Sequence, residues 1–473
     1  MKTFDVVVIG GGILGCFAAR NLRRWNISTL LLEKEADVCT GITRANSAIC
    51  YAGYDNKPGS LKAAMTVRGN ANMEHLCREL EVPFSRCGSL LVTYDGNAVS
   101  KLEQKLQNGM ENGVPGLRLI SGPEAEAMEP MLKNGVAAAL YAPSTGTLNP
   151  WQLGIAAFEN ARNNGAEAQF CSEVLYIDVV AGGFAVKTPR ETISCKIILN
   201  CAGLSADKLQ EMVADPSVKL RLDGAEYVVL DSAAEKPGRV IFHQGYSCGK
   251  GITAIPCPEG NLLISGVRKD LGIPFATTWE GLQALHQDTK NLLPELDLTK
   301  VIRSFGAVRP NPYRENGENI PDFSVENPLP GFYSLIGIKT PGLTCANELG
   351  LHLAQKAAEY LGAEENPDFD PNRKAISQKD HVIICQCEQV TRAEIVEAIR
   401  RGATTVDGVK RRVGMALWRW STTASALPPP RSCFTTMTVL CVRGSPVRWS
   451  SAALPMTACT ATIRSRSWMC WCG

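Results

Sequence analysis

The sequence of 473 residues has no long hydrophobic run and no dominant charge. No stretch approaches the roughly 18 consecutive apolar residues of a transmembrane helix, so no transmembrane segment is expected. The formal net charge of +2 gives no electrostatic reason to expect binding to nucleic acid or to an anionic membrane. The first apolar run, residues 4–9, is too short for a signal peptide and is followed at once by glycines. These absences predict a cytoplasmic protein and leave peripheral association with a membrane open.

Cysteine, by contrast, is plentiful, with 18 residues. Most of those before residue 380 occur singly in apolar or helical contexts, where a free cysteine acts as a small hydrophobic residue. In a cytoplasmic protein they are expected to be reduced rather than joined in disulfides. Only Cys385 and Cys387 are spaced as a pair of metal ligands.

The strongest motif opens the chain. Residues 4–9 form an apolar, β-branched run that leads directly into Gly-Gly-Gly-Ile-Leu-Gly, which satisfies the pattern G-x-G-x-x-G. A helical pattern follows, and a second strand-like run over residues 29–32 ends at Glu33. Strand, glycine turn, helix, strand and acid occur in the order of a dinucleotide-binding site, although an ordinary βα turn is the alternative.

Each glycine of the motif has a separate expected role. Gly10 allows a sharp turn, Gly12 lets the backbone approach a pyrophosphate, and Gly15 lets the helix pack closely on the strand. The pyrophosphate would lie on the free N–H groups at the positive end of the helix dipole. Glu33, with Lys34 beside it, follows at the spacing of a carboxylate that accepts hydrogen bonds from ribose hydroxyls.

Three further stretches carry turn motifs. A small polar loop contains Thr43, Asn46 and Ser47, and residues 57–62 follow it. An apolar strand over residues 197–199 ends in a turn of small residues before a helix. The members of that turn and helix that we single out are Ala202, Gly203 and Asp207.

The third stretch joins a strand over residues 332–338 to a helix that begins near Cys345. A Pro-Gly turn between them leaves backbone N–H groups at the helix start without helical partners. The candidate cofactor contacts in this stretch are Gly337, Thr340, Gly342, Leu343 and Thr344.

Together these motifs resemble the FAD-dependent oxidoreductases of the D-amino-acid-oxidase type, over about residues 3–361. The resemblance is nearest to FAD-dependent glycerol-3-phosphate dehydrogenases and L-2-hydroxyglutarate oxidases. It implies an α/β fold in which a Rossmann-like FAD-binding domain carries an inserted, mostly antiparallel β-sheet substrate domain. It also implies FAD as the cofactor.

The resemblance assigns cofactor contacts as well. A strand at Glu173 and Val174 would pass under the adenine, and the turn at Ala202 and Gly203 would approach the cofactor. The helix start after Gly342 would face the N1 and C2-oxygen edge of the isoalloxazine ring, where the positive helix end stabilises the anionic reduced flavin. Many relatives carry a histidine where this chain has Tyr51, so the resemblance supplies no histidine role at this position.

The expected domain boundaries follow from the same motifs. Residues 84–94 are expected to form one strand of the substrate domain, and residues 366–380 are typical of a linker. The FAD-binding domain is expected over residues 1–80, 151–215 and 331–365, and the substrate domain over residues 81–150 and 216–330.

Oxidation of a secondary alcohol by FAD needs a hydride acceptor at flavin N5, a base for the hydroxyl proton, and cations that hold an anionic substrate. Arg309 is the best anchor, because its planar fork suits a carboxylate or phosphate and matches the family's arginine; a strand-end salt bridge is the alternative. Lys250 is a candidate second cation and His243 a candidate base. Tyr54 would close the pocket or donate a hydrogen bond. Further candidates are Tyr227 and Lys339.

Residues 381–414 resemble the start of the small bacterioferritin-associated-ferredoxin-like domain, in which four thiolates hold a 2Fe-2S cluster. Cys385 and Cys387 match the first pair of thiolates, so they are candidate metal ligands. The second pair is missing, which puts the cluster in doubt. The later cysteines have the wrong spacing for it: Cys433, Cys441, Cys470 and Cys472.

From Met415 onward the sequence contains no Asp, Glu, Lys, Asn, Gln or His. A globular domain rarely lacks all these residue types over so long a stretch. We hypothesise that the reading frame slips near Gly414 and that residues 415–473 are not an evolved fold; a genuine low-complexity tail is the alternative. An unbroken reading frame in independently sequenced clones would contradict the hypothesis.

The resemblance implies a dehydrogenase that passes a hydride from a small anionic 2-hydroxy compound to flavin N5. The first expectation is oxidation of sn-glycerol 3-phosphate to dihydroxyacetone phosphate, and L-2-hydroxyglutarate is the runner-up substrate. An amine or amino-acid oxidase comes third. An alternative of another class is a non-catalytic FAD-containing subunit that transfers electrons to a partner flavoprotein.

Overall fold

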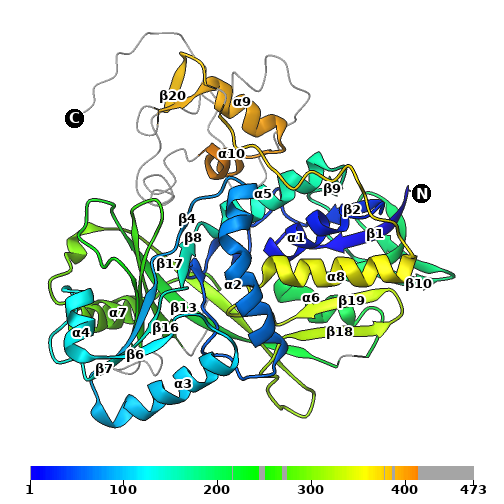
Figure 1. Ribbon diagram of the computed structural model, residues 1–473. Coiled ribbons are helices and arrows are strands. Elements are labelled where there is room, and N and C mark those ends of the chain that lie inside the picture. Colours follow the sequence, from blue (N-terminus) through cyan, green and yellow to red (C-terminus); the bar gives the residue numbers. More distant parts are fainter. Residues whose placement is uncertain are drawn as a thin grey trace.

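The computed structural model is built around two large β-sheets (Figure 1). It describes residues 2–215, 217–243, 251–268, 274–377, 379–385 and 389–413. The predictions for Lys250 and Cys387, and the hypothesis about residues 415–473, concern parts of the chain outside the described residues.

The first sheet contains the predicted Rossmann-like unit. Its parallel part has the order β9-β2-β1-β12-β19, and β10, β11 and β18 extend it by antiparallel pairing. The strands are β1 (Lys2–Ile9), β2 (Thr29–Leu32), β9 (Glu167–Gln169), β10 (Tyr176–Val180), β11 (Gly183–Lys187), β12 (Thr192–Asn200), β18 (Ser324–Leu329) and β19 (Phe332–Ile336). Because β18 pairs with β19, the boundary predicted at residue 330 falls inside a hairpin of this sheet.

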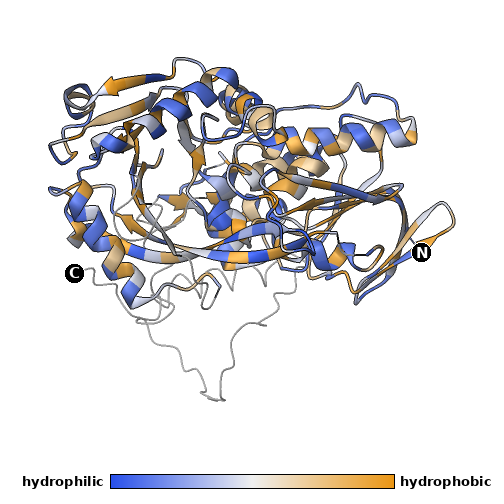
Figure 2. Cartoon of the chain, turned by 90° about the horizontal axis from the view of Figure 1, so that it is seen from below, coloured by the Kyte–Doolittle hydropathy of each residue, from blue (hydrophilic) through white to orange (hydrophobic). Residues whose placement is uncertain are grey.

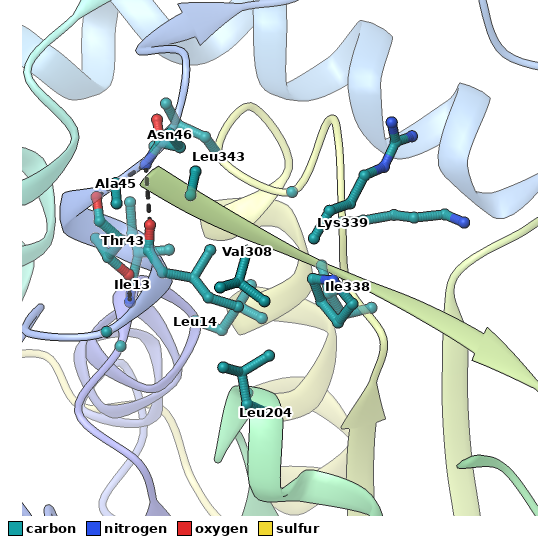
Figure 3. A pocket seen from close by; sticks show the side chains of 18 of the residues that line it. Ile13, Leu14, Thr43, Ala45, Asn46, Leu204, Val308, Ile338, Lys339 and Leu343 are labelled. Carbon is teal, nitrogen blue, oxygen red and sulfur yellow. Dashed lines mark hydrogen bonds between the residues drawn. The ribbon is translucent and has the colours of Figure 1, made fainter. Parts of the chain in front are cut away.

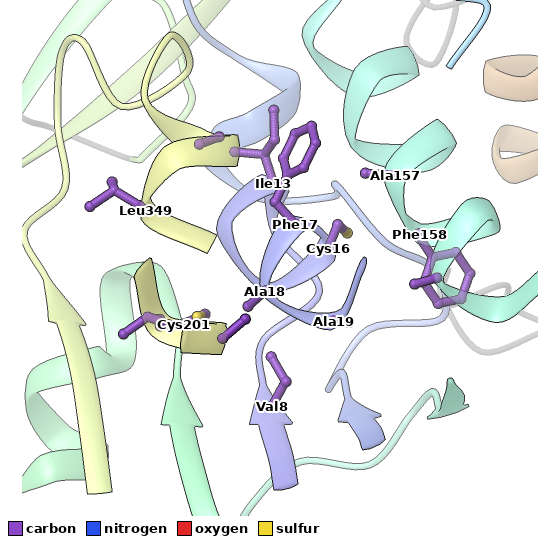
Figure 4. Packing of buried hydrophobic residues seen from close by; sticks show 14 of the residues in the cluster. Val8, Ile13, Cys16, Phe17, Ala18, Ala19, Ala157, Phe158, Cys201 and Leu349 are labelled. Carbon is purple, nitrogen blue, oxygen red and sulfur yellow. The ribbon is translucent and has the colours of Figure 1, made fainter. Parts of the chain in front are cut away.

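Three helices cover one face of the first sheet: α1 (Ile13–Leu22), α5 (Pro150–Asn163) and α8 (Ala346–Leu361). Helix α1 lies between the other two, and nearly all of its residues are buried, including Phe17 and Ala18 (Figure 4). A helix that is packed on every side is mostly apolar, and the two buried polar residues of α1, Arg20 and Asn21, are hydrogen-bonded. The dense packing fixes the glycine turn that precedes α1.

The second sheet is mostly antiparallel, with the order β17-β13-β16-β15-β14-β5-β7-β6. Its strands are β5 (Ser89–Thr93), β6 (Arg118–Ser121), β7 (Ala138–Ala142), β13 (Lys219–Leu230), β14 (Val240–His243), β15 (Ile252–Pro256), β16 (Leu262–Arg268) and β17 (Val301–Tyr313). Helix α7 (Trp279–Leu292) and the short α4 (Gly122–Met128) pack on one face, and α3 (Val99–Glu111) packs against β6 and β7 on the opposite face. Blue and orange bands alternate along the helices, as amphipathic packing requires (Figure 2).

The strand predicted over residues 84–94 is wrong, because the chain turns within it. Gly88 has φ +73°, a left-handed conformation that interrupts extended backbone. Residues on either side therefore enter different sheets: β4 (Phe84–Ser85) pairs with β8 (Gly146–Leu148), which also pairs with β3 (Ile49–Cys50), whereas β5 enters the second large sheet.

A long helix and a small module complete the structure. Helix α2 (Leu61–Glu79) begins at a Ser60 cap and packs against α8. The C-terminal module contains β20 (Ile383–Cys385), β21 (Val390–Thr391), α9 (Arg392–Arg400) and α10 (Val406–Val413), and α10 contacts α5 (Figure 1). None of the helices within the described ranges combines the length and hydrophobicity needed to cross a bilayer.

Candidate cofactor and substrate site

A cavity of about 1360 Å³ lies where the carboxyl ends of β1, β2 and β12 meet one face of the second sheet. All the predicted cofactor stretches contribute to its wall. Crevices at the carboxyl ends of parallel strands are where α/β sheets bind ligands. The volume exceeds that of a typical drug-sized pocket and suits an extended ligand.

The glycine turn after β1 is required by packing at two positions. Gly10 has φ +103°, and a Cβ there would lie 2.6 Å from the Cys201 carbonyl oxygen. A Cβ on Gly15 would overlap the Gly10 carbonyl oxygen. Gly15 does not line the cavity. Its role is the close packing of the helix, which the sequence predicts.

Gly12 differs, because the protein itself leaves room for a side chain there. A Cβ on Gly12 would meet only Thr43 Oγ1, at 3.6 Å. Gly12 lines the cavity at the start of α1, and the Ile13 N–H donates to Thr43 Oγ1 at 3.0 Å (Figure 3). The remaining first-turn N–H groups and the helix dipole suit a pyrophosphate. This geometry fits the diphosphate of FAD.

Glu33 is held rigidly at the end of β2. Its carboxylate accepts hydrogen bonds from the Gly11 N–H at 2.5 Å and the Glu35 N–H at 2.8 Å. Burial raises the pKa of Glu33 above its usual value, and these two backbone donors oppose that rise. Glu33 and Lys34 both line the cavity, where a carboxylate can accept from ribose hydroxyls.

The polar loop after Glu33 folds around Asn46. The Asn46 amide donates to the Thr43 carbonyl oxygen at 2.8 Å (Figure 3). The Ala48 N–H donates to Asn46 Oδ1, also at 2.8 Å. Thr43, Asn46 and the neighbouring Ser47 all line the cavity. The loop is therefore pre-formed by its own hydrogen bonds.

The second predicted stretch lies partly on the cavity wall. Ala202 and Gly203 line it, whereas Asp207, on α6 (Ala206–Gln210), does not. Val174 also lines the cavity, but the strand predicted at Glu173 and Val174 is wrong, because this segment is irregular backbone between β9 and β10.

The third stretch divides in the same way. Thr340, Gly342 and Leu343 line the cavity, and Leu343 points toward it with Ile338 nearby (Figure 3). Gly337 and Thr344 lie behind the wall. A Cβ on Gly337 would lie 2.6 Å from Pro312, and the buried Thr344 Oγ1 accepts from the Tyr51 N–H at 2.9 Å. Both residues support the turn rather than form its surface.

The opposite wall is a row of register partners across the second sheet. Phe242 pairs with Thr253, Thr253 with Ser265, and Ser265 with Tyr227. Residues that pair directly share a sheet face. Tyr227 pairs in turn with Phe305, four residues before Arg309, so Arg309 projects from the same face.

Arg309 therefore reaches the cavity, and it has a spare donor. Its Nε is buried and has no hydrogen-bond partner within the described ranges, where no ion pair to Arg309 is found either. The alternative of a strand-end salt bridge thus gains no support. The positive charge of Arg309 acts on Tyr51, Lys62 and Tyr227, which places these side chains around it.

The tyrosines at this end are neutral hydrogen-bonding groups. Burial raises the pKa values of Tyr51, Tyr54 and Tyr227 above the usual range. The Tyr51 ring stacks on Phe242 with centroids 6.0 Å apart, and its hydroxyl lies 3.3 Å from Ser47 Oγ. These phenols can donate hydrogen bonds to a substrate but are poor bases at neutral pH.

His243 does not support the role predicted for it. Ile241 packs among residues of the α7 side, and Phe242 faces the cavity, so alternation puts the His243 ring on the α7 side. Its ring lies against the Tyr94 ring, with the two ring centroids 5.7 Å apart. Burial lowers the pKa of His243, and Asp288 on α7 opposes this. The imidazole faces away from the candidate substrate, although His243 borders the cavity.

Sequence reasoning gave no role to Lys62. Lys62 lines the cavity, and its Nζ donates to the Pro321 carbonyl oxygen at 2.6 Å. Burial lowers the pKa of Lys62 below its usual value; the charge of Asp322 opposes this shift and that of Arg309 adds to it. The other predicted lysine, Lys339, lines the cavity and donates to Asn311 Oδ1 at 2.9 Å.

Only one of the two predicted metal ligands lies within the described residues. Cys385 is buried at the end of β20, and Cys387 lies outside the described residues. In the part of the chain that the structure describes, no three His, Cys, Asp or Glu side chains are grouped to hold a metal ion.

Comparisons with known proteins agree with this geometry. A sequence model of the FAD dependent oxidoreductase family matches residues 5–356, and one of the BFD-like [2Fe-2S] binding domain matches residues 383–416. The glycerol 3-phosphate dehydrogenase of Caloramator mitchellensis is 37% identical over 443 residues, covering 88% of this chain and 91% of its own. Human mitochondrial L-2-hydroxyglutarate dehydrogenase is 31% identical over 225 residues, covering 45% and 48%.

A solved structure shares the fold. Dithionite-reduced L-alpha-glycerophosphate oxidase from Mycoplasma pneumoniae with FAD bound superimposes with a TM-score of 0.72, at 24% identity, over 79% of this chain and 99% of that one.

Proposed function

The chain belongs to the family of FAD dependent oxidoreductases, and from that premise we propose that it oxidises the secondary hydroxyl of sn-glycerol 3-phosphate. FAD is the cofactor, and when bound it supplies the isoalloxazine ring that accepts a hydride. The observation that supports an anionic substrate is Arg309, a cavity-facing guanidinium whose buried Nε has no partner in the described part of the chain. A planar fork of this kind suits a phosphate.

The chain's own residues bind and orient the substrate. Arg309 would hold the phosphate, and Lys62 would add a second positive charge at the same end of the cavity. The neutral hydroxyls of Tyr51 and Tyr227 would orient the substrate by hydrogen bonds. We assign no base, because His243 faces α7.

A second candidate substrate is L-2-hydroxyglutarate. It is favoured by the relatives that carry that name, and Arg309 would bind a carboxylate as well as a phosphate. A non-catalytic FAD-containing subunit remains the alternative of another class. We further propose a partner flavoprotein as electron acceptor, supported by the match of residues 383–416.

A cytoplasmic location belongs to the same proposal. The eleven cysteines within the described ranges form no disulfide with one another, as expected in a reducing compartment.

The test is anaerobic titration of the FAD-loaded protein with each substrate, followed by loss of flavin absorbance. We expect bleaching with sn-glycerol 3-phosphate. Bleaching with L-2-hydroxyglutarate alone would favour the second candidate. Bleaching with neither compound, in protein that is bleached by dithionite, would favour the non-catalytic subunit.

A further inference from the structure

The C-terminal module reaches the cofactor cavity. Thr405, Asp407 and Arg411, at the start of and within α10, line the same cavity as Gly12 and Glu33. They come from a module that follows the FAD-binding domain in sequence and that no cofactor motif includes. Three cavity-lining residues on one short segment call for a physical account.

Direct contacts join this segment to the loop that follows Glu33. The Thr404 hydroxyl donates to the Ala36 carbonyl oxygen at 2.8 Å. Arg411 donates through Nη1 to the Val38 carbonyl oxygen and through Nη2 to Asp37 Oδ2, both at 2.7 Å. The Nε of Arg411 also lies 3.2 Å from Asp407 Oδ2. Arg411 thus joins an acid of α10 to the loop at the adenosine end of the cavity.

A buried ion-pair network fixes this arrangement. Both Asp37 and Glu159 have side chains only 2% exposed. Arg412 donates to Asp37 Oδ2 at 2.8 Å and Oδ1 at 2.9 Å, and its Nε donates to Glu159 Oε1 at 3.2 Å. Buried carboxylates are tolerated only when they are paired and hydrogen-bonded in this way.

The close approach of α10 depends on a glycine. A Cβ on Gly408 would lie 2.7 Å from Asp37 Oδ2, which is too close for a real contact. Glycine is about 1 kcal/mol less favourable than alanine inside a helix, so its presence here is explained by the approach rather than by helix formation.

We propose that α10 is part of the FAD site. The hydroxyl of Thr405 and the carboxylate of Asp407 contact the adenosine half of FAD, at the end of the cavity marked by Glu33. Both groups accept hydrogen bonds from ribose hydroxyls or from the adenine amino group. Arg411 is a positioning residue, since it holds Asp407 against the loop after β2. The inference rests on FAD as the cofactor and is independent of the proposed substrate.

The test measures binding of FAD and of ADP, which has the adenosine half but no flavin, to the full-length apoprotein by calorimetry. We expect Arg411→Ala and Asp407→Asn each to weaken the binding of FAD and of ADP in parallel. For Arg411→Ala both affinities should fall at least about tenfold. Arg400→Ala is the matched control, because Arg400 is exposed on α9 and forms a long ion pair, at 3.8 Å, with Glu397 of the same helix. It should leave both affinities unchanged.

Gly408→Ala keeps the experiment informative if Arg411→Ala fails to fold. Alanine favours the helix itself, so α10 stays helical while its approach to Asp37 is blocked. We expect the same parallel loss of FAD and ADP affinity. Wild-type affinities in both Gly408→Ala and Asp407→Asn would overturn the proposal, and so would an equal loss in Arg400→Ala. No substrate is present, so failure to oxidise glycerol 3-phosphate does not bear on the result.

Discussion

At the scale of single residues, Arg309 is where one substitution tests the substrate end of the cavity. Arg309→Ala removes the fork that would hold the phosphate. Truncating one partner of a desolvated charge pair costs about 2–5 kcal/mol, so kcat/KM for sn-glycerol 3-phosphate should fall at least roughly 30-fold. Arg309→Lys should recover part of the loss, because lysine keeps the charge without the fork.

The control for Arg309 is Arg314→Ala, in the exposed turn after β17. It removes the same charge from the same region but not from the cavity wall. Steady-state kinetics of dye reduction measure both variants. Arg309→Ala with nearly wild-type kcat/KM would show that Arg309 does not hold the substrate.

Lys62 makes a prediction about pH. An amine is charged below its pKa and neutral above it, and burial lowers the pKa of Lys62 from its usual 10.5. Its positive charge is therefore lost at a lower pH than that of an exposed lysine. If this charge helps to hold an anion, KM should rise as the pH increases toward the usual lysine pKa.

The matched variant is Lys62→Arg, because arginine stays charged throughout this range. KM measured as a function of pH should then show a rise in the wild type that is absent in the variant. The raised pKa values of Tyr51 and Tyr227 keep their phenols from ionising first. A wild-type KM that does not change with pH would contradict the prediction.

At the scale of elements, the turn from β1 to α1 separates folding from cofactor binding. The methyl group of Gly12→Ala meets no atom closer than 3.6 Å. The free energy of unfolding of the variant apoprotein should therefore lie within about 1 kcal/mol of the wild-type value. The same methyl group enters the cavity beside the helix start, so FAD affinity should fall at least about tenfold. Gly15→Ala would overlap the Gly10 carbonyl oxygen and should destabilise the fold itself.

Chemical denaturation of the apoproteins and flavin titration distinguish the two effects. Similar losses of stability in both variants would mean that Gly12, too, is required by packing. Normal FAD binding by Gly12→Ala would place the pyrophosphate elsewhere.

These glycines were predictable because their causes are local. A sharp turn, a close helix and a strand lie within a few residues of one another in the sequence. The break at Gly88 was not, because a single glycine between strand-like residues such as Phe84 and Leu90 has the same pattern whether the chain turns or continues. The side of the sheet that His243 faces also depends on register with neighbouring strands, which no single segment specifies.

At the scale of the whole molecule, contacts between segments that are distant in the chain could not be predicted from the sequence. Arg373, Arg401 and Arg412 converge on Glu159, more than 200 residues earlier. A charged residue in a helical pattern is normally a solvated one, so nothing local marks Glu159 as buried. The division into two large sheets was predictable from the motifs, whereas the docking of the C-terminal module was not.

Glu159→Gln tests how far this network holds the module in place. The substitution removes a buried charge and leaves three arginines with a weaker shared acceptor, and breaking a buried pair typically costs about 3–5 kcal/mol. Glu359→Gln is the control, because its pair with Lys356 on α8 is exposed and such pairs contribute less than about 1 kcal/mol. Denaturant unfolding of the two apoproteins should therefore show a larger loss of unfolding free energy in Glu159→Gln than in Glu359→Gln. Limited proteolysis over residues 366–380 should be faster in Glu159→Gln alone. Equal stability and equal cleavage in the two variants would mean that α10 is held by its apolar contacts and by Asp37, with Glu159 contributing little.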